Sequence, residues 1–291
     1  MKDKQSLLFV AAAVLGVALS TSSMACAQEA TETPADKQSL LSHATDDGQA
    51  ATAKQPSSQS VAAPSENEWH LVLSPYLWFP GVHGTMGARD ELASIHASAV
   101  DLLSHFRFGL LGAADLSYKR LLAPIDMIWV RLGDDKALPG LALGAITANV
   151  KASEFILTPK IGFRVLKREK LTIDALTGFR TWHLGQNLQF SPSRLGLQFQ
   201  GSQNWVDPLV GGRIHVALTP KMEVTIAGDV GGWGAGSQLD YQVVGLLGYK
   251  IKPKWTLQAG YRYLDVNYRS GGGVFDVAMS GVVFGVSINV K

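Results

Sequence analysis

The carboxyl-terminal third of the chain consists of short segments in which apolar and polar residues alternate. In residues 221–230 one face carries aliphatic side chains and the other polar ones: Met222, Val224, Ile226 and Val230 against Glu223, Thr225 and Asp229. Residues 255–263 and 275–290 repeat this alternation. A period of two is typical of a β-strand with one apolar and one polar face. Several such strands in succession predict a sheet whose apolar face is covered by lipid or by a protein core.

The amino terminus has the three parts of a secretory signal peptide. Lys2 and Lys4 precede the apolar run Leu7–Leu19, and Ala25-Cys26-Ala27 supplies a small-residue cleavage site. The run is too short to span a bilayer as a helix. We therefore predict that residues 1–27 are a signal peptide and that the mature chain is exported. A lipoprotein cut before Cys26 is a weaker alternative, because Ser23 stands where a large aliphatic residue is expected.

The mature chain lacks a candidate membrane-spanning helix in its sequence. After Leu19 no uninterrupted apolar run reaches 18 residues, although 46% of all residues are hydrophobic. In a bilayer only helices and closed barrels satisfy every backbone polar group. The alternating segments of an exported chain therefore predict an all-β fold, a closed antiparallel up-and-down transmembrane β-barrel of the kind found in Gram-negative outer membranes.

Composition divides the mature chain into two parts. In residues 28–68 Gln, Ala, Ser, Thr and Pro dominate, and seven acids face two lysines, which gives a net charge of −5. Such a segment buries too little apolar surface to offset its chain entropy, so we predict a disordered periplasmic leader, as a spacer or as a tether to a partner. Residues 69–291 carry a net charge of +6 and form the predicted barrel. Their scattered cations are no signature of nucleic-acid binding.

Counting strands back from the carboxyl terminus, which we expect in the periplasm, gives about ten, with eight or twelve as alternatives. The predicted strands span residues 69–79, 108–118, 125–132, 154–166, 171–184, 207–218, 221–230, 238–249, 255–268 and 275–290. Single-chain bacterial barrels have even strand numbers. The connection 81–107 is long enough for a further hairpin strand near Ala93–Ala99 and a helical turn at Asp101–His105. These additions would favour twelve strands or a plug.

The tryptophans favour lipid over a soluble core. All seven lie in the barrel region, and most are near the ends of predicted strands: Trp69, Trp78, Trp129, Trp182, Trp233 and Trp255. Amphipathic rings prefer the two headgroup levels of a bilayer, which produces aromatic girdles. We therefore expect these rings on the outer wall at the two membrane surfaces.

Motifs rich in glycine and aromatic residues follow one another along the barrel region. They are Pro75-Tyr76-Leu77-Trp78 with Gly81 and Gly84, Trp205-Val206-Asp207-Pro208 before Gly211-Gly212-Arg213, Gly228-Asp229-Val230-Gly231-Gly232, Gly260-Tyr261-Arg262-Tyr263-Leu264-Asp265-Val266, and Ser280-Gly281 with Gly285. Together they resemble a family of largely uncharacterised Gram-negative outer-membrane β-barrel proteins. The resemblance implies a barrel and no agreed activity. One departure is the final Lys291, because such proteins commonly end in an aromatic residue that the assembly machinery recognises.

If the apolar faces meet lipid, the ionisable side chains of the opposite faces point into the lumen. We predict this set as structural or pore-lining: Asp115, Asp126, Glu154, Lys160, Arg164, Asp174, Arg180, Asp207, Arg213, His215, Glu223, Asp229, Asp240 and Arg262. Buried charges persist only when they are paired, so we expect Arg–carboxylate bridges with Arg180, Arg213 and Arg262 as bidentate donors. Arg213 and Arg262 are available to neutralise Asp207 and Asp229. Side chains can nearly fill a cylinder of about ten strands, which favours a plugged interior over an open channel.

The sequence contains no motif that assigns a catalytic, cofactor-binding or metal-binding residue. His83, His96, His105 and His183 lie near the predicted outer side, but their spacings match no metal or nucleophile motif, and no G-x-S-x-G occurs. Solvated loop histidines are the ordinary explanation, so an enzyme is the less favoured interpretation.

We predict an outer-membrane barrel of unassigned role, either a narrow porin-like passage for small polar solutes or an envelope-structural protein. The alternatives are a lipid-modifying or proteolytic barrel enzyme, and a soluble periplasmic lipocalin-like binder whose apolar faces would enclose a ligand. No cofactor is expected. The expected partners are outer-membrane lipid, lipopolysaccharide and the barrel-assembly machinery, with no nucleic acid.

Overall fold

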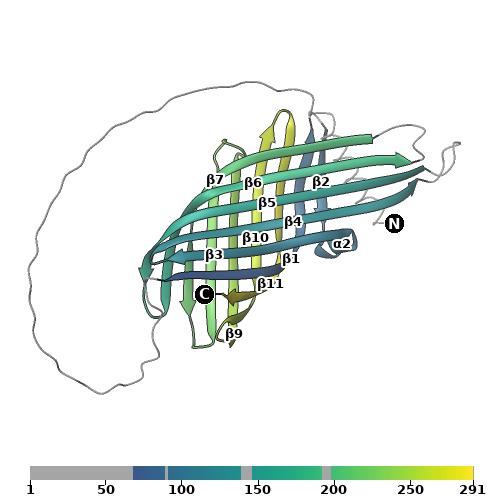
Figure 1. Ribbon diagram of the computed structural model, residues 1–291. Helices are drawn as coiled ribbons and strands as arrows, with labels where there is room; N and C mark the ends of the chain where they lie inside the picture. The colour runs from purple at the N-terminus through teal and green to yellow at the C-terminus, as the bar shows by residue number, and fades with distance from the viewer. Residues whose placement is uncertain (1–67, 89–90, 139–145, 192–197, 291) are drawn as a thin grey trace, which may run out of the picture. The chain divides into compact units, whose positions relative to one another are not determined.

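The alternating segments form the wall of a closed antiparallel barrel in a computed structural model that describes residues 68–88, 91–138, 146–191 and 198–290 (Figure 1). The predicted signal peptide and, except for Glu68, the predicted leader lie outside the described residues. No helix within the described ranges is long and apolar enough to cross a membrane.

The described residues form eleven strands and one short helix. They are β1 (Trp69–Ala88), β2 (Glu91–Ala97), α2 (Ala99–Ser104), β3 (Phe106–Tyr118), β4 (Leu121–Leu138), β5 (Ile146–Lys167), β6 (Leu171–Ser191), β7 (Gln198–Ala217), β8 (Met222–Gly232), β9 (Leu239–Lys252), β10 (Trp255–Ser270) and β11 (Gly273–Asn289). Sequential neighbours pair from β3 to β11, and β11 and β3 both pair with β1, which closes a ring of ten strands. The predicted fold class and the strand number of ten are confirmed. The predicted extra strand and helical turn exist as β2 and α2, but they do not enlarge the ring.

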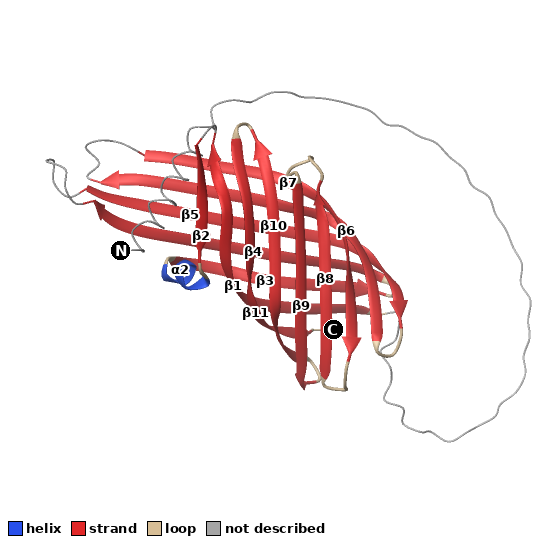
Figure 2. Cartoon of the chain, turned by 180° about the vertical axis from the view of Figure 1, so that it is seen from behind, coloured by secondary structure: helices blue, strands red, loops and turns tan. Residues whose placement is uncertain are grey.

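The two ends of the barrel differ in their connections. Trp69 and Asn289 lie at one end, called here the terminal end, where neighbouring strands are joined by short turns at residues 119–120, 168–170, 218–221 and 253–254. The opposite end is called the loop end. Strands β4–β7 are 18, 22, 21 and 20 residues long, against 11 residues for β8. They extend the wall at the loop end (Figure 2). The sequence prediction made these four strands too short, because their extensions lack a clear apolar alternation.

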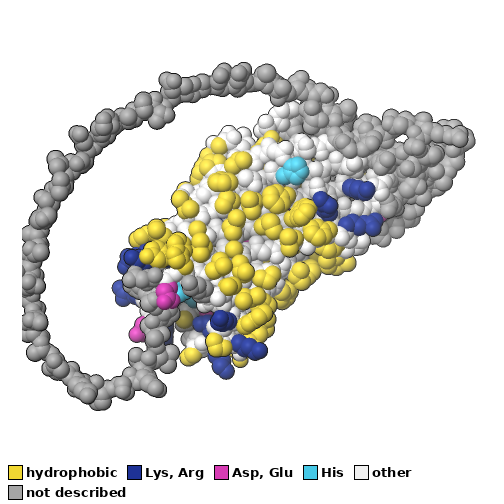
Figure 3. Space-filling model, in the orientation of Figure 1, with side chains coloured by type: hydrophobic (Ala, Val, Ile, Leu, Met, Phe, Trp, Pro, Cys, Tyr) yellow, Lys and Arg dark blue, Asp and Glu magenta, His cyan; other side chains and the backbone are white. Residues whose placement is uncertain are grey.

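The apolar faces of the strands form the outer wall. Ile161, Ile226 and Phe284 are 67%, 51% and 51% exposed, and hydrophobic side chains cover much of the visible surface of the barrel (Figure 3). The polar faces point inward, where Arg262 is 4% exposed and Arg180 is fully buried. Around these residues burial separates the two faces along the alternation seen in the sequence, whereas nearer the loop end inward-facing residues such as Leu264 and Val266 are apolar as well.

The expectation that the tryptophans form outer girdles is wrong for two of the six named residues. Trp78 and Trp182 are buried inside the barrel, as is Trp205. Their neighbours Leu77 and Val206 face outward, so strand alternation directs the indole rings to the lumen. Trp69, Trp233 and Trp255 are exposed, as expected of outer-wall residues. Nearness to a strand end did not determine which face a ring occupies.

The wall has one seam, between β1 and β3. β1 pairs with β3 over residues 69–75 and with β2 over residues 82–88, so residues 76–81 of β1 pair with neither strand. The Leu71 carbonyl accepts from Val290 N on the β11 side, so by alternation Pro80 faces the seam. Proline has no N–H and therefore loses no ladder bond at an unpaired edge.

Closure of the ring depends on a close approach between β11 and β1. Gly281 pairs with Pro80, and a Cβ at Gly281 would lie 2.0 Å from the Phe79 carbonyl oxygen. We expect Gly281→Ala to lower the free energy of unfolding by about 1–3 kcal/mol, because the added methyl group forces the two strands apart. Urea unfolding of the refolded chain, followed by tryptophan fluorescence, measures this change.

The matched control is Gly245→Ala, since a Cβ at Gly245 meets nothing within 4 Å. Equal unfolding midpoints for the two variants would contradict the assignment of Gly281 as a closure residue.

Candidate functional site

The inward-facing polar residues form ion-paired groups that follow one another along the lumen and are together called here the charge layer, in which ion pairs join five cations to five carboxylates. Arg213 binds Asp115 and Asp174, Arg164 binds Asp174, Lys160 binds Asp229, Arg180 binds Asp229 and Asp240, and Arg262 binds Asp126. The charges within this group balance. A buried ion in a narrow lumen is tolerable only with such partners.

Arg180 on β6 is the most buried cation of the charge layer. Its Nη2 donates to Asp229 Oδ1 at 2.7 Å, its Nη1 donates to Asp240, and its Nε donates to Thr158 Oγ1 at 3.2 Å. Lys160 Nζ donates to the second oxygen of Asp229 at 2.5 Å. The guanidinium therefore bridges two carboxylates, one on β8 and one on β9. The sequence analysis had predicted a bidentate bridge to a carboxylate.

Two further arginines organise smaller groups. Arg213 donates to Asp174 Oδ2 through Nε and Nη2, at 3.1 and 3.0 Å, and to Asp115 through Nη1. Arg262 donates through Nη2 to Asp126 and through Nη1 to the Tyr76 hydroxyl, both at 2.8 Å. Tyr76 in turn donates to Asp126 Oδ1 at 2.7 Å, which closes a three-membered ring of hydrogen bonds.

The expected neutralisation of Asp207 and Asp229 by Arg213 and Arg262 is wrong. Asp229 is held by Lys160 and Arg180. Asp207 accepts from Ser237 N at 2.6 Å and from Trp205 Nε1 at 2.9 Å. Arg213 follows Asp207 by six residues on the same strand, which separates their Cα atoms by roughly 20 Å. A side chain cannot span that distance, so Asp207 instead anchors the turn before β9.

Three remaining members of the predicted set lie apart from the charge layer. Glu223 and His215 are near the terminal end, where Glu223 Oε2 lies 3.6 Å from Lys250 Nζ and 3.8 Å from His215 Nε2. Glu154 on β5 is on the loop side, and its Oε1 is buried without a hydrogen-bond partner among the described residues. The structure therefore does not bring these three side chains into the charge layer.

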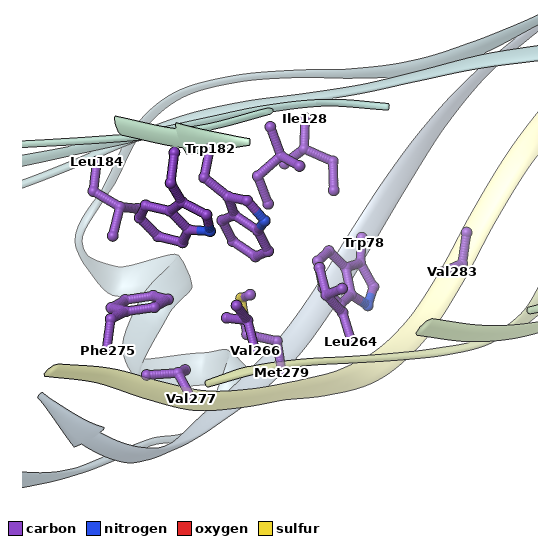
Figure 4. Packing of buried hydrophobic residues seen from close by; sticks show 12 residues of the cluster. Trp78, Ile128, Trp182, Leu184, Leu264, Val266, Phe275, Val277, Met279 and Val283 are labelled. Atoms are coloured by element: carbon purple, nitrogen blue, oxygen red, sulfur yellow. The ribbon is translucent and has the colours of Figure 1, made fainter. Parts of the chain in front are cut away.

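On the loop side of the charge layer the lumen is filled by hydrophobic side chains, called here the apolar cluster (Figure 4). Its buried members are Trp78, Ile128, Ile156, Trp182, Leu184, Trp205, Leu264, Val266, Phe275, Val277, Met279 and Val283. Trp182 stacks on Trp205 with ring centroids 5.3 Å apart, and Trp205 stacks on Tyr268 at 4.1 Å. Phe275 lies 6.2 Å from Trp182. These contacts join β6 and β7 to β10 and β11 across the lumen.

Tryptophan side chains connect the apolar cluster to the polar groups below it. Trp182 Nε1 donates to Asp240 Oδ2 at 3.0 Å, while its ring packs in the cluster. The Arg262 guanidinium carbon lies 5.0 Å from the centroid of the Trp78 ring, in a cation–π contact. Indole suits this boundary at Trp182 because it has a large apolar surface and a single polar N–H group. The Trp78 Nε1 is buried without a hydrogen-bond partner among the described residues, so Trp78 meets the polar side through its ring face. Sequence reasoning assigned these rings to lipid and so missed this role.

Ser104, His105 and Asp134 form the one grouping on the loop side that resembles a hydrolase triad among the described side chains. Ser104 Oγ lies 2.9 Å from His105 Nδ1, and His105 Nε2 lies 3.7 Å from Asp134 Oδ2. However, His105 Nδ1 is 2.7 Å from the Asp101 carbonyl oxygen, and Ser104 donates to that same oxygen. Nδ1 must therefore carry a proton, and it cannot act as the base that activates Ser104.

The other histidines near the loop end have ordinary contacts. His83 and His96 are cross-strand neighbours on β1 and β2, with ring centroids 6.2 Å apart. His183 hydrogen-bonds Asn204 through Nδ1. These contacts give the imidazoles no nucleophile to activate.

Comparison with known proteins identifies the fold. No protein-family model and no curated protein matches the chain. Among solved structures, the outer membrane protease OmpT from Escherichia coli is similar over 79% of this chain and 99% of its own, with a TM-score of 0.52 and 9% sequence identity. The translocator domain of the autotransporter NalP from Neisseria meningitidis covers 76% of this chain and 88% of its own, with a TM-score of 0.38 and 15% identity. At such identities the likeness concerns the barrel fold alone.

The charge layer is expected to contribute to stability through its most buried member. We predict that Arg180→Leu lowers the free energy of unfolding by about 3–5 kcal/mol, because Asp240 loses its cation and Asp229 keeps only Lys160. Equilibrium unfolding in urea, measured in detergent micelles, provides the value.

Arg269→Leu is the control, because it removes an arginine from an ion pair that is exposed and not buried. Arg269 and Asp276 form a 3.1 Å pair near the loop end, with side chains 56% and 38% exposed. Such surface pairs contribute about 0–1 kcal/mol. An Arg180 variant as stable as the Arg269 variant would show that the layer contributes little.

Proposed function

We propose that this chain is an integral outer-membrane barrel whose lumen is closed, and that it acts as an envelope-structural protein rather than as a porin-like passage. The supporting observation is that side chains fill the lumen at two successive levels. Arg180 is fully buried in the charge layer, and the Trp182–Trp205–Phe275 group connects opposite walls in the apolar cluster. A small barrel filled in this way leaves no continuous aqueous path.

The outer wall supports a membrane location. Strongly exposed apolar side chains occur on all sides of the ring, for example Leu77 on β1, Ile161 on β5, Val243 on β9 and Phe284 on β11. Soluble monomers rarely expose so much continuous apolar surface. In a lipocalin-like binder these side chains would line the interior, so that alternative loses its main support.

The proposal includes an orientation and an export route. Bacterial barrels place short turns in the periplasm and longer loops outside, so the terminal end faces the periplasm. Residues 1–27 would direct export, and residues 28–68 would remain in the periplasm as a leader. We also propose that the chain is related to the uncharacterised outer-membrane barrels that it resembles, and that the barrel-assembly machinery inserts it.

A closed lumen predicts the absence of ion conduction. We expect the full chain, refolded and inserted into planar lipid bilayers, to produce no stepwise current above baseline. We also expect the triple variant Trp182→Ala, Trp205→Ala and Phe275→Ala to produce no current, because the charge layer with the fully buried Arg180 still closes the lumen at its own level. Reproducible conductance steps from the unsubstituted chain would overturn the closed-lumen proposal and favour a porin-like passage.

A further inference from the structure

Three cations lie on the outer wall toward the loop end: Arg107 on β3, Arg131 on β4 and Lys151 on β5. All three are exposed. Ile128 is buried in the apolar cluster, so Trp129 and Arg131 face the opposite way, to the outer wall. Gly133 pairs with Lys151, which places Lys151 on the same face as Arg131. Figure 3 shows Lys and Arg side chains beyond the hydrophobic area at this end of the described surface.

These cations are held close to one another by side-chain packing. The Arg131 guanidinium carbon lies 4.8 Å from the centroid of the Trp129 ring, and Phe108 meets that ring edge-on at 5.0 Å. The space over Gly133 is occupied by Arg107, whose Cγ and Nε would lie 3.3 Å from a Cβ at that glycine. Arg107 and Lys151 are therefore both next to Gly133, and Arg131 is two residues away on the same face.

The outer face of β3–β6 changes character in successive rows toward the loop end. A row of large apolar residues, Leu110, Trp129 and Phe155, is followed by Arg131, Ser153 and Gly185, and then by Gly133, Lys151 and Asn187. A hollow of about 860 Å³ has the three cations, Ser153 and Asn187 among its lining residues, together with Asp134, whose carboxylate lies 3.7 Å from His105 Nε2. The order from apolar to aromatic to cationic side chains matches the order of groups across a lipid–water interface.

We propose that Arg107, Arg131 and Lys151 form a binding site for the phosphate groups of a glycolipid of the outer leaflet, the lipid A moiety of lipopolysaccharide. The inference rests on the proposed outer-membrane location. Arginine and lysine bind phosphate oxygens through charge-assisted hydrogen bonds. Trp129 and Phe108 contact the upper part of the acyl chains, while Ser153 and Asn187 supply hydrogen-bonding groups for the sugars. The position of the cations above an aromatic row favours a lipid phosphate over a soluble anion.

The test measures binding of purified lipid A to the full chain refolded in detergent micelles, by titration of the thermal unfolding midpoint. We expect the double variant Arg131→Gln and Lys151→Gln to bind lipid A about tenfold or more weakly, because two charged hydrogen bonds are lost. Lipid A with its phosphates removed should bind the unsubstituted chain as weakly. The control is Lys252→Gln with Lys254→Gln, which removes the same charge from exposed residues at the terminal end and should bind lipid A unchanged.

Three results would overturn the site. They are equal losses in both double variants, equal binding of phosphorylated and dephosphorylated lipid A, and full competition by inorganic phosphate at the concentration of lipid A used. Heat-modifiable gel mobility of each variant shows that it has folded. Flotation with lipid vesicles separates the two proposals. If the chain floats with the vesicles but binds phosphorylated and dephosphorylated lipid A equally, the lipid A site is contradicted and the membrane location is not. If the chain does not float, the membrane location itself is contradicted.

Discussion

The pairing of the Arg180 guanidinium with Asp229 and Asp240 constrains how the strands of the barrel can be placed relative to one another. A fully buried cation between two carboxylates requires that β6, β8 and β9 keep their registers, since small displacements would leave a charge without a partner. Thr158 and Lys160 extend the same contacts to β5. The interior is thus held by bonds across the lumen as well as by the ladder between neighbouring strands.

The buried tryptophans lie where the charge layer and the apolar cluster meet inside the barrel. Each indole ring packs with aliphatic and aromatic neighbours, while its edge or its face meets a charged group of the adjoining level. Without such residues, carboxylates such as Asp240 would border directly on hydrocarbon, where an unpaired polar atom is costly. At the β1–β3 seam, residues 76–81 of β1 make no ladder pairs with β3. In the chain, β2 and α2 form the connection between these two strands.

Sequence alternation was sufficient to predict the strand number, the antiparallel order and the lumenal face of residues such as Arg180 and Arg262, because these follow from a period of two. It could not predict which charges meet. Partners across a lumen depend on strand stagger and tilt, which no local pattern specifies, so Asp207 was assigned to arginines that do not pair with it. The lengths of β4–β7 were missed for a related reason: beyond the apolar band, both faces of a strand meet polar surroundings and the alternation fades. The basic site near Trp129 likewise depends on cross-strand pairs that only the register reveals.

The proposed membrane location and the closed lumen both depend on which face of each strand meets lipid. The most direct test of this assignment is the collision of lipid-soluble oxygen with spin labels placed singly at Val282, Val283 and Phe284 of β11, in the chain reconstituted into vesicles. Phe284 and Val282 are 51% and 43% exposed on the outer wall, whereas Val283 is 6% exposed in the apolar cluster. The account predicts high oxygen accessibility at Val282 and Phe284 and low accessibility at Val283. High accessibility at Val283 with low accessibility at Val282 and Phe284 would contradict it, because the strand face assigned to the lumen would then be the one that meets lipid.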